Sequence, residues 1–228
     1  MLQNFESLVL IWLGLGFITF ITLLKIPAPY GKFSKTNWGP MIPSQVGWIV
    51  MEIISPLALL YFFLNGNIEK TPTNITFISL WTLHYFNRSV IYPLRQNNPA
   101  QMPLIIAVLA FLFNVMNGYI NGTYFGSIQE YSAEYMSNWN FIVGVCLFII
   151  GAYINIKSDN ILLSLRSKSG EYKIPEGFMF RYVSFPNYFG EILEWMAFAI
   201  MTWSLAGLSF MIWTMANLVP RAIKGHQW

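Results

Sequence analysis

Long apolar runs separated by short polar, proline or glycine breaks make up most of the chain. A helix needs roughly 20 apolar residues to cross a bilayer, and the runs have about that length. The last run is longer and supplies two helices, with a break near 204–207. The pattern therefore predicts seven transmembrane helices in one domain over residues 1–228, at about 6–25, 42–64, 72–94, 101–120, 138–157, 187–203 and 204–221.

Composition favours a membrane protein over a soluble one. Hydrophobic residues make up 55% of the chain and charged residues only 10%, whereas soluble domains carry about 25% charged residues. The first run is longer than the core of a signal peptide and no basic residue precedes it, so we interpret it as a retained helix. The predicted fold class is all-α and polytopic. The net charge of +3 is too small to indicate a nucleic-acid partner.

Basic residues fall on one side of this seven-helix arrangement. The first, third and fifth loops, the C-terminus and the adjoining helix ends contain 12 of them, and the opposite side has only Lys70. Because basic loops stay in the cytoplasm, we expect the N-terminus outside and the C-terminus in the cytoplasm. The 12 residues are Lys25, Lys32, Lys35, Arg88, Arg95, Lys157, Arg166, Lys168, Lys173, Arg181, Arg221 and Lys224.

The fifth loop, at about 158–186, is long for a helical bundle and rich in charge. Loops of that length are often functional. A solvated cytoplasmic connector is the alternative interpretation.

Several acidic and polar side chains lie inside the apolar runs. A charge at the centre of a membrane helix costs roughly 3 kcal/mol, so each one is a functional candidate. Glu52 lies in the second helix, and Glu191 and Glu194 lie early in the sixth. Asn187 precedes Glu191 by four residues and therefore shares its helix face.

The third and fifth helices carry further candidates. His84, Tyr85 and Arg88 lie in the third, and Asn155 and Asp159 lie four residues apart near the end of the fifth. Structural roles are the alternatives: Arg88 and Asp159 could reach the interface or pair with each other. In the same way, Glu194, which precedes Trp195, could be a buried ion-pair partner that orients helices.

Two other kinds of site have little support. His84 and His226 are far apart, and the single cysteine, Cys146, lies in an apolar run, so we expect neither a metal site nor an internal disulfide. Gly14 and Gly16 imitate the start of a dinucleotide fingerprint, but they lie inside the first predicted membrane helix with no preceding strand. A nucleotide would therefore be held without a Rossmann fold.

Five segments together resemble the steroid 5α-reductase (3-oxo-5α-steroid 4-dehydrogenase) family. Their order and spacing match from about Trp48 to the C-terminus, over three quarters of the chain, and the combination is specific although each segment is short. The composition, rich in Ile and Asn with small loops, is typical of a bacterial member. The segments are NYFGEILEW at 187–195, GAYINIKSD at 151–159, YKIPEGF at 172–178, LHYFNR at 83–88 followed by Tyr92-Pro93, and PRA at 220–222.

The resemblance implies a seven-helix membrane reductase that uses NADPH to saturate the 4,5 double bond of a 3-oxo-Δ4 steroid. The family residues that hold the substrate's 3-keto oxygen match Glu52 and Tyr85. The family's dinucleotide contacts match six residues here, and three arginines are further candidates for its phosphates. The six are Asn155, Asp159, Arg166, Lys173, Asn187 and Glu191, and the arginines are Arg88, Arg95 and Arg221.

These residue types suit the implied reaction. Hydride delivered to the β-carbon of an enone moves negative charge onto the carbonyl oxygen, where Tyr85 and a protonated Glu52 can donate hydrogen bonds. Burial among apolar helices favours the protonated form of a carboxyl group.

The expected partners are a steroid or other apolar enone from the bilayer, NADPH from the cytoplasm, and lipid. We expect a multi-pass monomer in a bacterial inner membrane rather than the endoplasmic reticulum. Alternative enzymes are an enoyl or polyprenol reductase and an S-adenosylmethionine-dependent methyltransferase of isoprenylcysteine or phospholipid. The non-enzyme alternative is a proton-coupled transporter with Glu52, Glu191 and Glu194 as relay, although no internal repeat supports it.

Overall fold

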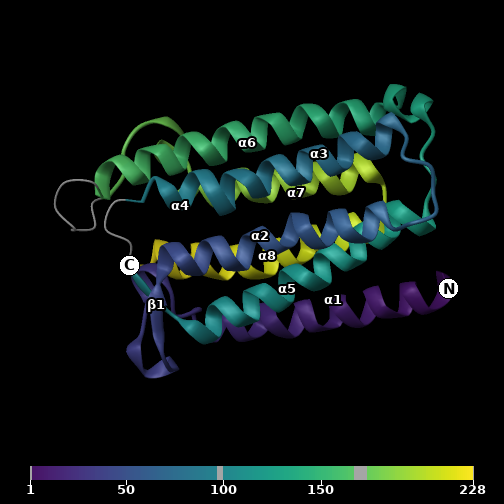
Figure 1. Cartoon of the computed structure of the whole chain (residues 1–228). Coiled ribbons are helices and arrows are strands. Elements are labelled where there is room, and N and C mark those ends of the chain that lie inside the picture. Colours follow the sequence, from purple (N-terminus) through teal and green to yellow (C-terminus); the bar gives the residue numbers. More distant parts are fainter. Residues whose placement is uncertain (1, 97–99, 167–173, 228) are drawn as a thin grey trace. The chain divides into compact units, whose positions relative to one another are not determined.

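A computed structural model describes residues 2–96, 100–166 and 174–227. Within these ranges the chain forms seven long helices (Figure 1). They are α1 (Leu2–Lys25), α2 (Ser44–Leu64), α3 (Pro72–Phe86), α5 (Leu104–Thr123), α6 (Trp139–Arg166), α7 (Pro186–Thr202) and α8 (Leu205–His226).

Shorter elements connect or extend these helices. The π-helical segment η3 (Asn87–Ile91) and the short helix α4 (Tyr92–Leu94) continue α3, so a helix covers the predicted 72–94. A second π-helical segment, η4 (Tyr124–Ile128), extends α5. The remaining elements are the 3₁₀ turns η1 (Gly31–Phe33), η2 (Thr36–Trp38), η5 (Ala133–Ser137) and η6 (Phe178–Arg181), and the strands β1 (Met41–Pro43) and β2 (Gln101–Pro103).

The structure is mostly helical, as the all-α prediction expects, and its two short strands change two predicted helix starts. β1 pairs antiparallel with β2, with Ile42 opposite Met102, so helices begin at 44 and 104 rather than at 42 and 101. A residue before proline favours an extended backbone, and each strand ends in a proline. The Ser44 amide donates to the Ala100 carbonyl at 2.8 Å, which ties the start of α2 to the segment leading into α5.

Burial explains where α6 ends, and capping explains the break between α7 and α8. α6 continues to Arg166, so the predicted helix end at 157 was wrong. Ser158 and Asp159 are buried helical residues rather than the start of a solvated loop. The predicted break near 204–207 is confirmed. Trp203 has a left-handed backbone (φ 46°), and the Ser204 hydroxyl accepts from the Gly207 amide at 2.9 Å, which caps α8.

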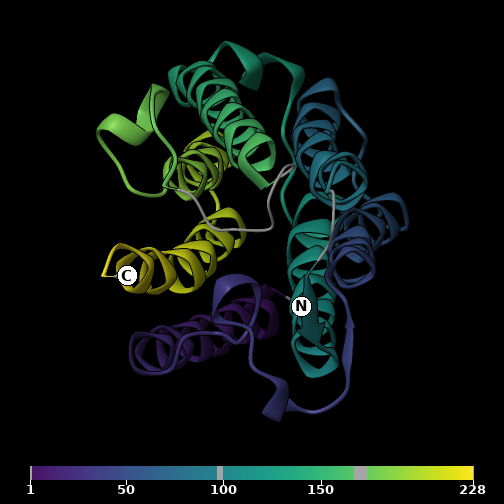
Figure 2. The ribbon, with the colours of Figure 1, turned by 90° about the vertical axis from the view of Figure 1, so that its left-hand side faces the viewer.

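The chain divides into two compact units, and each is described by itself. Unit 1 comprises residues 1–27 and 137–228, and unit 2 comprises residues 28–136. Within unit 1, α7 packs against both α6 and α8, and α1 packs on α8 (Figures 1 and 2). Within unit 2, α2 packs along α5, and α3 with η3 packs on α2.

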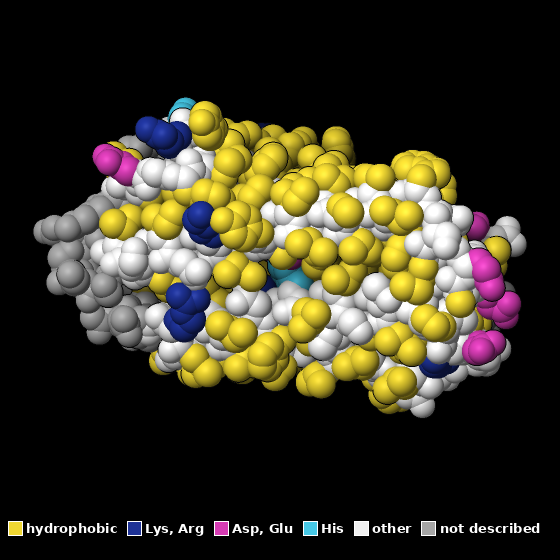
Figure 3. Space-filling model, turned by 90° about the horizontal axis from the view of Figure 1, so that it is seen from above, with side chains coloured by type: hydrophobic (Ala, Val, Ile, Leu, Met, Phe, Trp, Pro, Cys, Tyr) yellow, Lys and Arg dark blue, Asp and Glu magenta, His cyan; other side chains and the backbone are white. Residues whose placement is uncertain are grey.

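Four helical stretches in the described part of the chain are long and apolar enough to cross a membrane. They are residues 2–25, 44–64, 104–128 and 139–165. Large hydrophobic side chains such as Ile11, Phe17, Leu57 and Tyr61 are exposed along them, and Figure 3 shows hydrophobic side chains over most of the visible helix surface. These stretches indicate an integral membrane protein.

Candidate functional site

The two predicted catalytic residues both belong to unit 2. Glu52 lies on α2 and is half-buried, and Tyr85 lies near the end of α3 with only 4% of its surface exposed. The Tyr85 ring stacks on Trp81 at 5.7 Å between centroids and meets the edge of the His84 ring at 5.2 Å. The tyrosine ring is therefore held by aromatic neighbours on its own helix.

Contacts on either side of Tyr85 show which turn of α2 it faces. The Trp81 indole donates to the Ser55 hydroxyl at 3.1 Å, and the Arg88 guanidinium lies 4.8 Å from the centroid of the Trp48 ring. Glu52 lies between Trp48 and Ser55 on α2, just as Tyr85 lies between Trp81 and Arg88. The carboxyl and the phenol therefore belong to one facing stretch of two packed helices.

A third residue, Asn114 of α5, joins this stretch. Tyr85 donates its hydroxyl hydrogen bond to Asn114 Oδ1 at 3.1 Å, and Asn114 Nδ2 donates to the Met51 carbonyl at 2.6 Å. Asn114 thus links the tyrosine to the backbone directly before Glu52. Asn114 was not among the residues predicted from the sequence, although an asparagine in the middle of an apolar run is a signal of a functional position.

The candidate phosphate-binding arginines lie in different environments. Arg88 is buried in η3, with its guanidinium over the rings of Trp48 and Tyr92 at 4.8 and 5.2 Å. Because Arg88 is buried, its side chain does not reach out to the membrane interface, which was one of the two structural roles expected for it. Arg95, directly after α4, is exposed. In unit 1 the Arg221 Nε donates to the Tyr188 hydroxyl at 2.8 Å.

Unit 1 brings three of the predicted dinucleotide contacts together. Asn155 Nδ2 donates to the Asn187 carbonyl at 2.9 Å, and Asn187 Nδ2 donates to Asp159 Oδ1 at 3.0 Å. All three side chains are buried, so Asp159, like Arg88, does not reach out to the interface. The four-residue spacing of Asn155 and Asp159 on α6 lets both reach Asn187 at the start of α7.

Two glycines allow α6 and α7 to approach this closely. A Cβ atom on Gly151 would lie 2.7 Å from the Gly190 carbonyl oxygen, and one on Gly190 would lie 2.5 Å from the Asn155 amide nitrogen. Only glycine fits both positions without moving a backbone. We call this contact, with Asn155, Asp159 and Asn187, the α6–α7 seam.

Two buried polar atoms of unit 1, one on α6 and one on α7, have capacity left for a ligand. Among the described residues, Ser158 Oγ and Asn187 Oδ1 are buried and accept or donate no hydrogen bond. Buried polar groups are usually paired, so such atoms are candidates for ligand contacts. Amide, hydroxyl and carboxylate groups are the donors and acceptors that the carboxamide and ribose hydroxyls of a dinucleotide require. The residues present therefore fit such a ligand.

The remaining predicted contacts are less closely assembled. Glu191 lies one turn after Asn187 and is half-buried. Glu194 is buried, and its backbone amide would lie 2.8 Å from a Cβ on Gly151, so it lines the α6–α7 contact. The Arg166 side chain and Lys173 lie outside the described residues.

Comparison with known proteins shows the family to which the chain belongs. A family model described as 3-oxo-5-alpha-steroid 4-dehydrogenase matches residues 100–228. The steroid 5-alpha-reductase DET2 of Gossypium hirsutum is 41% identical over 218 residues, which cover 92% of this chain and 84% of the relative. The 3-oxo-5-alpha-steroid 4-dehydrogenase 1 of Rattus norvegicus is 35% identical over 219 residues, which cover 94% of this chain and 84% of the relative.

The chain belongs to the 3-oxo-5-alpha-steroid 4-dehydrogenase family. Members of this family are oxidoreductases acting on CH–CH groups, and this chain is one of them. The resemblance inferred from short motifs is therefore confirmed at the level of the family.

Proposed function

We propose that this protein reduces the 4,5 double bond of 3-oxo-Δ4 steroids to 5α-dihydrosteroids, with NADPH as the reductant. The observation that carries the proposal is the facing pair Glu52 and Tyr85 in a chain that belongs to a steroid dehydrogenase family. Both groups can donate a hydrogen bond, and both lie inside an apolar helix pair that suits a steroid.

Glu52 and Tyr85 would polarise the 3-keto oxygen of the substrate during the reaction. When hydride adds at C5, the electron pair of the double bond moves toward the carbonyl and negative charge develops on this oxygen. The enolate then takes up one proton at C4, which completes the reduction. Donors aimed at the carbonyl oxygen stabilise the transition state more than the ground state. Glu52 acts here as a protonated carboxyl, and Tyr85 as a neutral phenol.

The residues of the α6–α7 seam would hold the reductant. Bound NADPH supplies the hydride for C5. Asn187 Oδ1 and Ser158 Oγ are buried hydrogen-bonding atoms that such a ligand can satisfy, and Asp159 orients the Asn187 amide. Glu191, Arg166, Lys173, Arg88, Arg95 and Arg221 complete the proposed set of nucleotide contacts.

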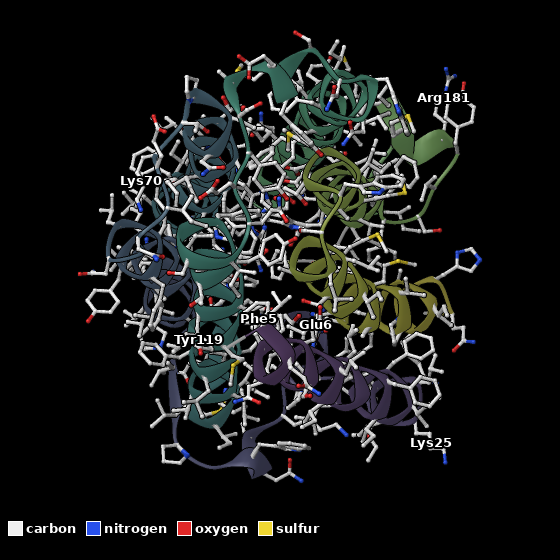
Figure 4. The ribbon with its side chains drawn as sticks, turned by 90° about the vertical axis from the view of Figure 1, so that its right-hand side faces the viewer. Phe5, Glu6, Lys25, Lys70, Tyr119 and Arg181 are labelled. Carbon is white, nitrogen blue, oxygen red and sulfur yellow. The ribbon has the colours of Figure 1, made fainter. Side chains whose placement is uncertain are left out.

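The topology we propose has seven crossings, the N-terminus outside and the C-terminus in the cytoplasm. In unit 1, α1 has Glu6 near its start and ends with Lys25, and α8 runs in the same direction and has Lys224 in its last turn (Figure 1). Figure 4 shows Lys25 and Arg181 pointing outward. In unit 2, Lys70 shares the α2–α3 turn with Glu69, whereas Arg95 follows α4 at the other end. Each unit by itself thus has a basic end that suits the cytoplasm.

The test uses purified protein in detergent, NADPH deuterated at the transferable position, and progesterone. Mass spectrometry should find the dihydro product with one deuterium at C5. NADPH binding without product would redirect the proposal to enoyl or polyprenol substrates. S-adenosylmethionine binding in place of NADPH would favour a methyltransferase, and proton-coupled flux in proteoliposomes without nucleotide would favour a transporter.

A further inference from the structure

The orientation of the Asn114 amide decides where the Tyr85 proton points. The Met51 carbonyl oxygen can only accept, so the Asn114 atom 2.6 Å from it must be the NH₂ group. The opposite assignment would place two acceptor oxygens against each other. Asn114 Oδ1 therefore faces Tyr85 and, as an acceptor, takes the only hydroxyl proton of the tyrosine at 3.1 Å.

This proton cannot be donated to Asn114 and to a substrate ketone at the same time. A neutral ketone is no stronger an acceptor than an amide oxygen, so Tyr85 keeps its hydrogen bond to Asn114 when the ketone binds. An oxygen that has gained negative charge is a much stronger acceptor, because hydrogen bonds to charged groups are roughly twice as strong as neutral ones. Both side chains are buried, with 3% of Asn114 and 4% of Tyr85 exposed, so bulk water does not compete for this proton.

We propose that Asn114 is a positioning residue that reserves the Tyr85 proton for the charged transition state. In the ground state Glu52 alone donates to the ketone, and the hydroxyl turns from Asn114 to the substrate oxygen only as hydride transfer proceeds. An interaction made only in the transition state raises kcat without lowering KM. The inference rests on the proposed reaction and on the role of Tyr85 in it.

The first experiment measures progesterone kinetics for Tyr85→Phe. Loss of a donor made only in the transition state should lower kcat by about 100-fold and leave KM within about 2-fold of the unaltered protein. A raised KM with an unchanged kcat would show that the hydroxyl already binds the ground-state ketone, and would overturn the inference.

The second experiment removes the competing acceptor. Asn114→Leu should tighten binding of 5α-dihydroprogesterone, a saturated 3-ketone that cannot react further, by about 5-fold, because the hydroxyl then no longer donates to Asn114 and can donate to the ketone. The gain should vanish in the double variant Asn114→Leu/Tyr85→Phe. Equal binding by Asn114→Leu and the unaltered protein, or a gain that persists in the double variant, would overturn the inference.

Asn121→Leu is the matched control for lost packing. Asn121 is also a buried asparagine of α5, but its Nδ2 bonds to Asn117 of the same helix at 3.1 Å. The variant should leave the ketone affinity unchanged. An unaltered protein that forms no labelled product would overturn the proposed function and this inference together. Product formation with a KM effect in Tyr85→Phe would overturn only the inference.

Discussion

Unit 2 and unit 1 place their candidate residues by different means. In unit 2, Glu52, Tyr85 and Asn114 come from α2, α3 and α5, and side-chain hydrogen bonds and aromatic stacking hold them. In unit 1, the seam joins only α6 and α7, and glycines bring the backbones into contact. The first arrangement leaves a phenol proton that can turn. In the second arrangement, hydrogen bonds across a close backbone contact orient the amide and carboxyl groups, which suits a ligand bound in one orientation.

The largest expected effect tests whether unit 2 carries the chemistry. Glu52→Gln keeps the size of the side chain but removes the acidic donor, so kcat should fall by about 100- to 1,000-fold. NADPH affinity should not change, because the seam is untouched. Deuterium transfer to progesterone measures the first quantity, and equilibrium binding of NADPH measures the second.

Glu69→Gln is the control for this variant, since Glu69 is an exposed glutamate of unit 2 in the turn between α2 and α3. Turnover should remain that of the unaltered protein. A Glu52→Gln protein that is equally fast would remove the carboxyl from the mechanism.

The next largest effect tests whether the seam depends on the close contact between the backbones of α6 and α7. Gly151→Ala should lower the stability by about 1–3 kcal/mol, because its Cβ would overlap the Gly190 carbonyl at 2.7 Å. Gly14→Ala has no atom within 4 Å of the new Cβ and should be neutral or slightly stabilising. Thermal unfolding in detergent measures both, and equal Tm values for the two variants would contradict the close contact.

A smaller effect tests whether the seam holds the nucleotide. Asn187→Ala removes the amide that Asp159 accepts from, but keeps the backbone carbonyl that Asn155 bonds to. The affinity for NADPH should fall by about 10-fold, the value of one or two lost hydrogen bonds, with kcat nearly unchanged.

The matched control is Asn140→Ala, in the first turn of α6. The Asn140 side chain donates to the Ile200 carbonyl at 3.4 Å, so the substitution removes a bond between the same two helices near their other end. NADPH affinity should be unchanged in this variant. A similar loss in both variants would mean that helix packing, rather than a nucleotide contact, explains the effect.

The smallest effect lies outside the membrane helices, at η5 of unit 2. The hydrogen bond from Ser132 lowers the pKa of the exposed Glu134 carboxyl from its ordinary 4.5. A carboxyl with a lowered folded-state pKa stabilises the fold above its ordinary pKa, and the contribution disappears as the pH falls through the lower value. Ser132→Ala should therefore show a small decrease in Tm at pH 7 that vanishes once the pH has fallen below the lowered pKa of Glu134. A pH-independent difference would contradict this origin.

The apolar pattern and the short motifs determined much of this protein. They predicted the helices, because each needs a long apolar stretch, and the break before Leu205 is where Ser204 and Gly207 form a cap. They also identified the family. Boundaries were less accurate where polar residues are buried. Ser158 and Asp159 are polar, but both are buried within α6, and Asp159 accepts a hydrogen bond from Asn187 of α7.

Only tertiary structure decided which polar residues meet. Asn155 and Asp159 share a face by spacing, but their link to Asn187 depends on the glycine contact between α6 and α7. Likewise, nothing local to Asn114 relates it to Tyr85, 29 residues away. Helix periodicity fixes the direction in which a side chain leaves the axis of its helix. Which partner the side chain meets depends on how a second and a third helix pack against that helix. The proton direction at Tyr85 follows from that packing and from no local pattern.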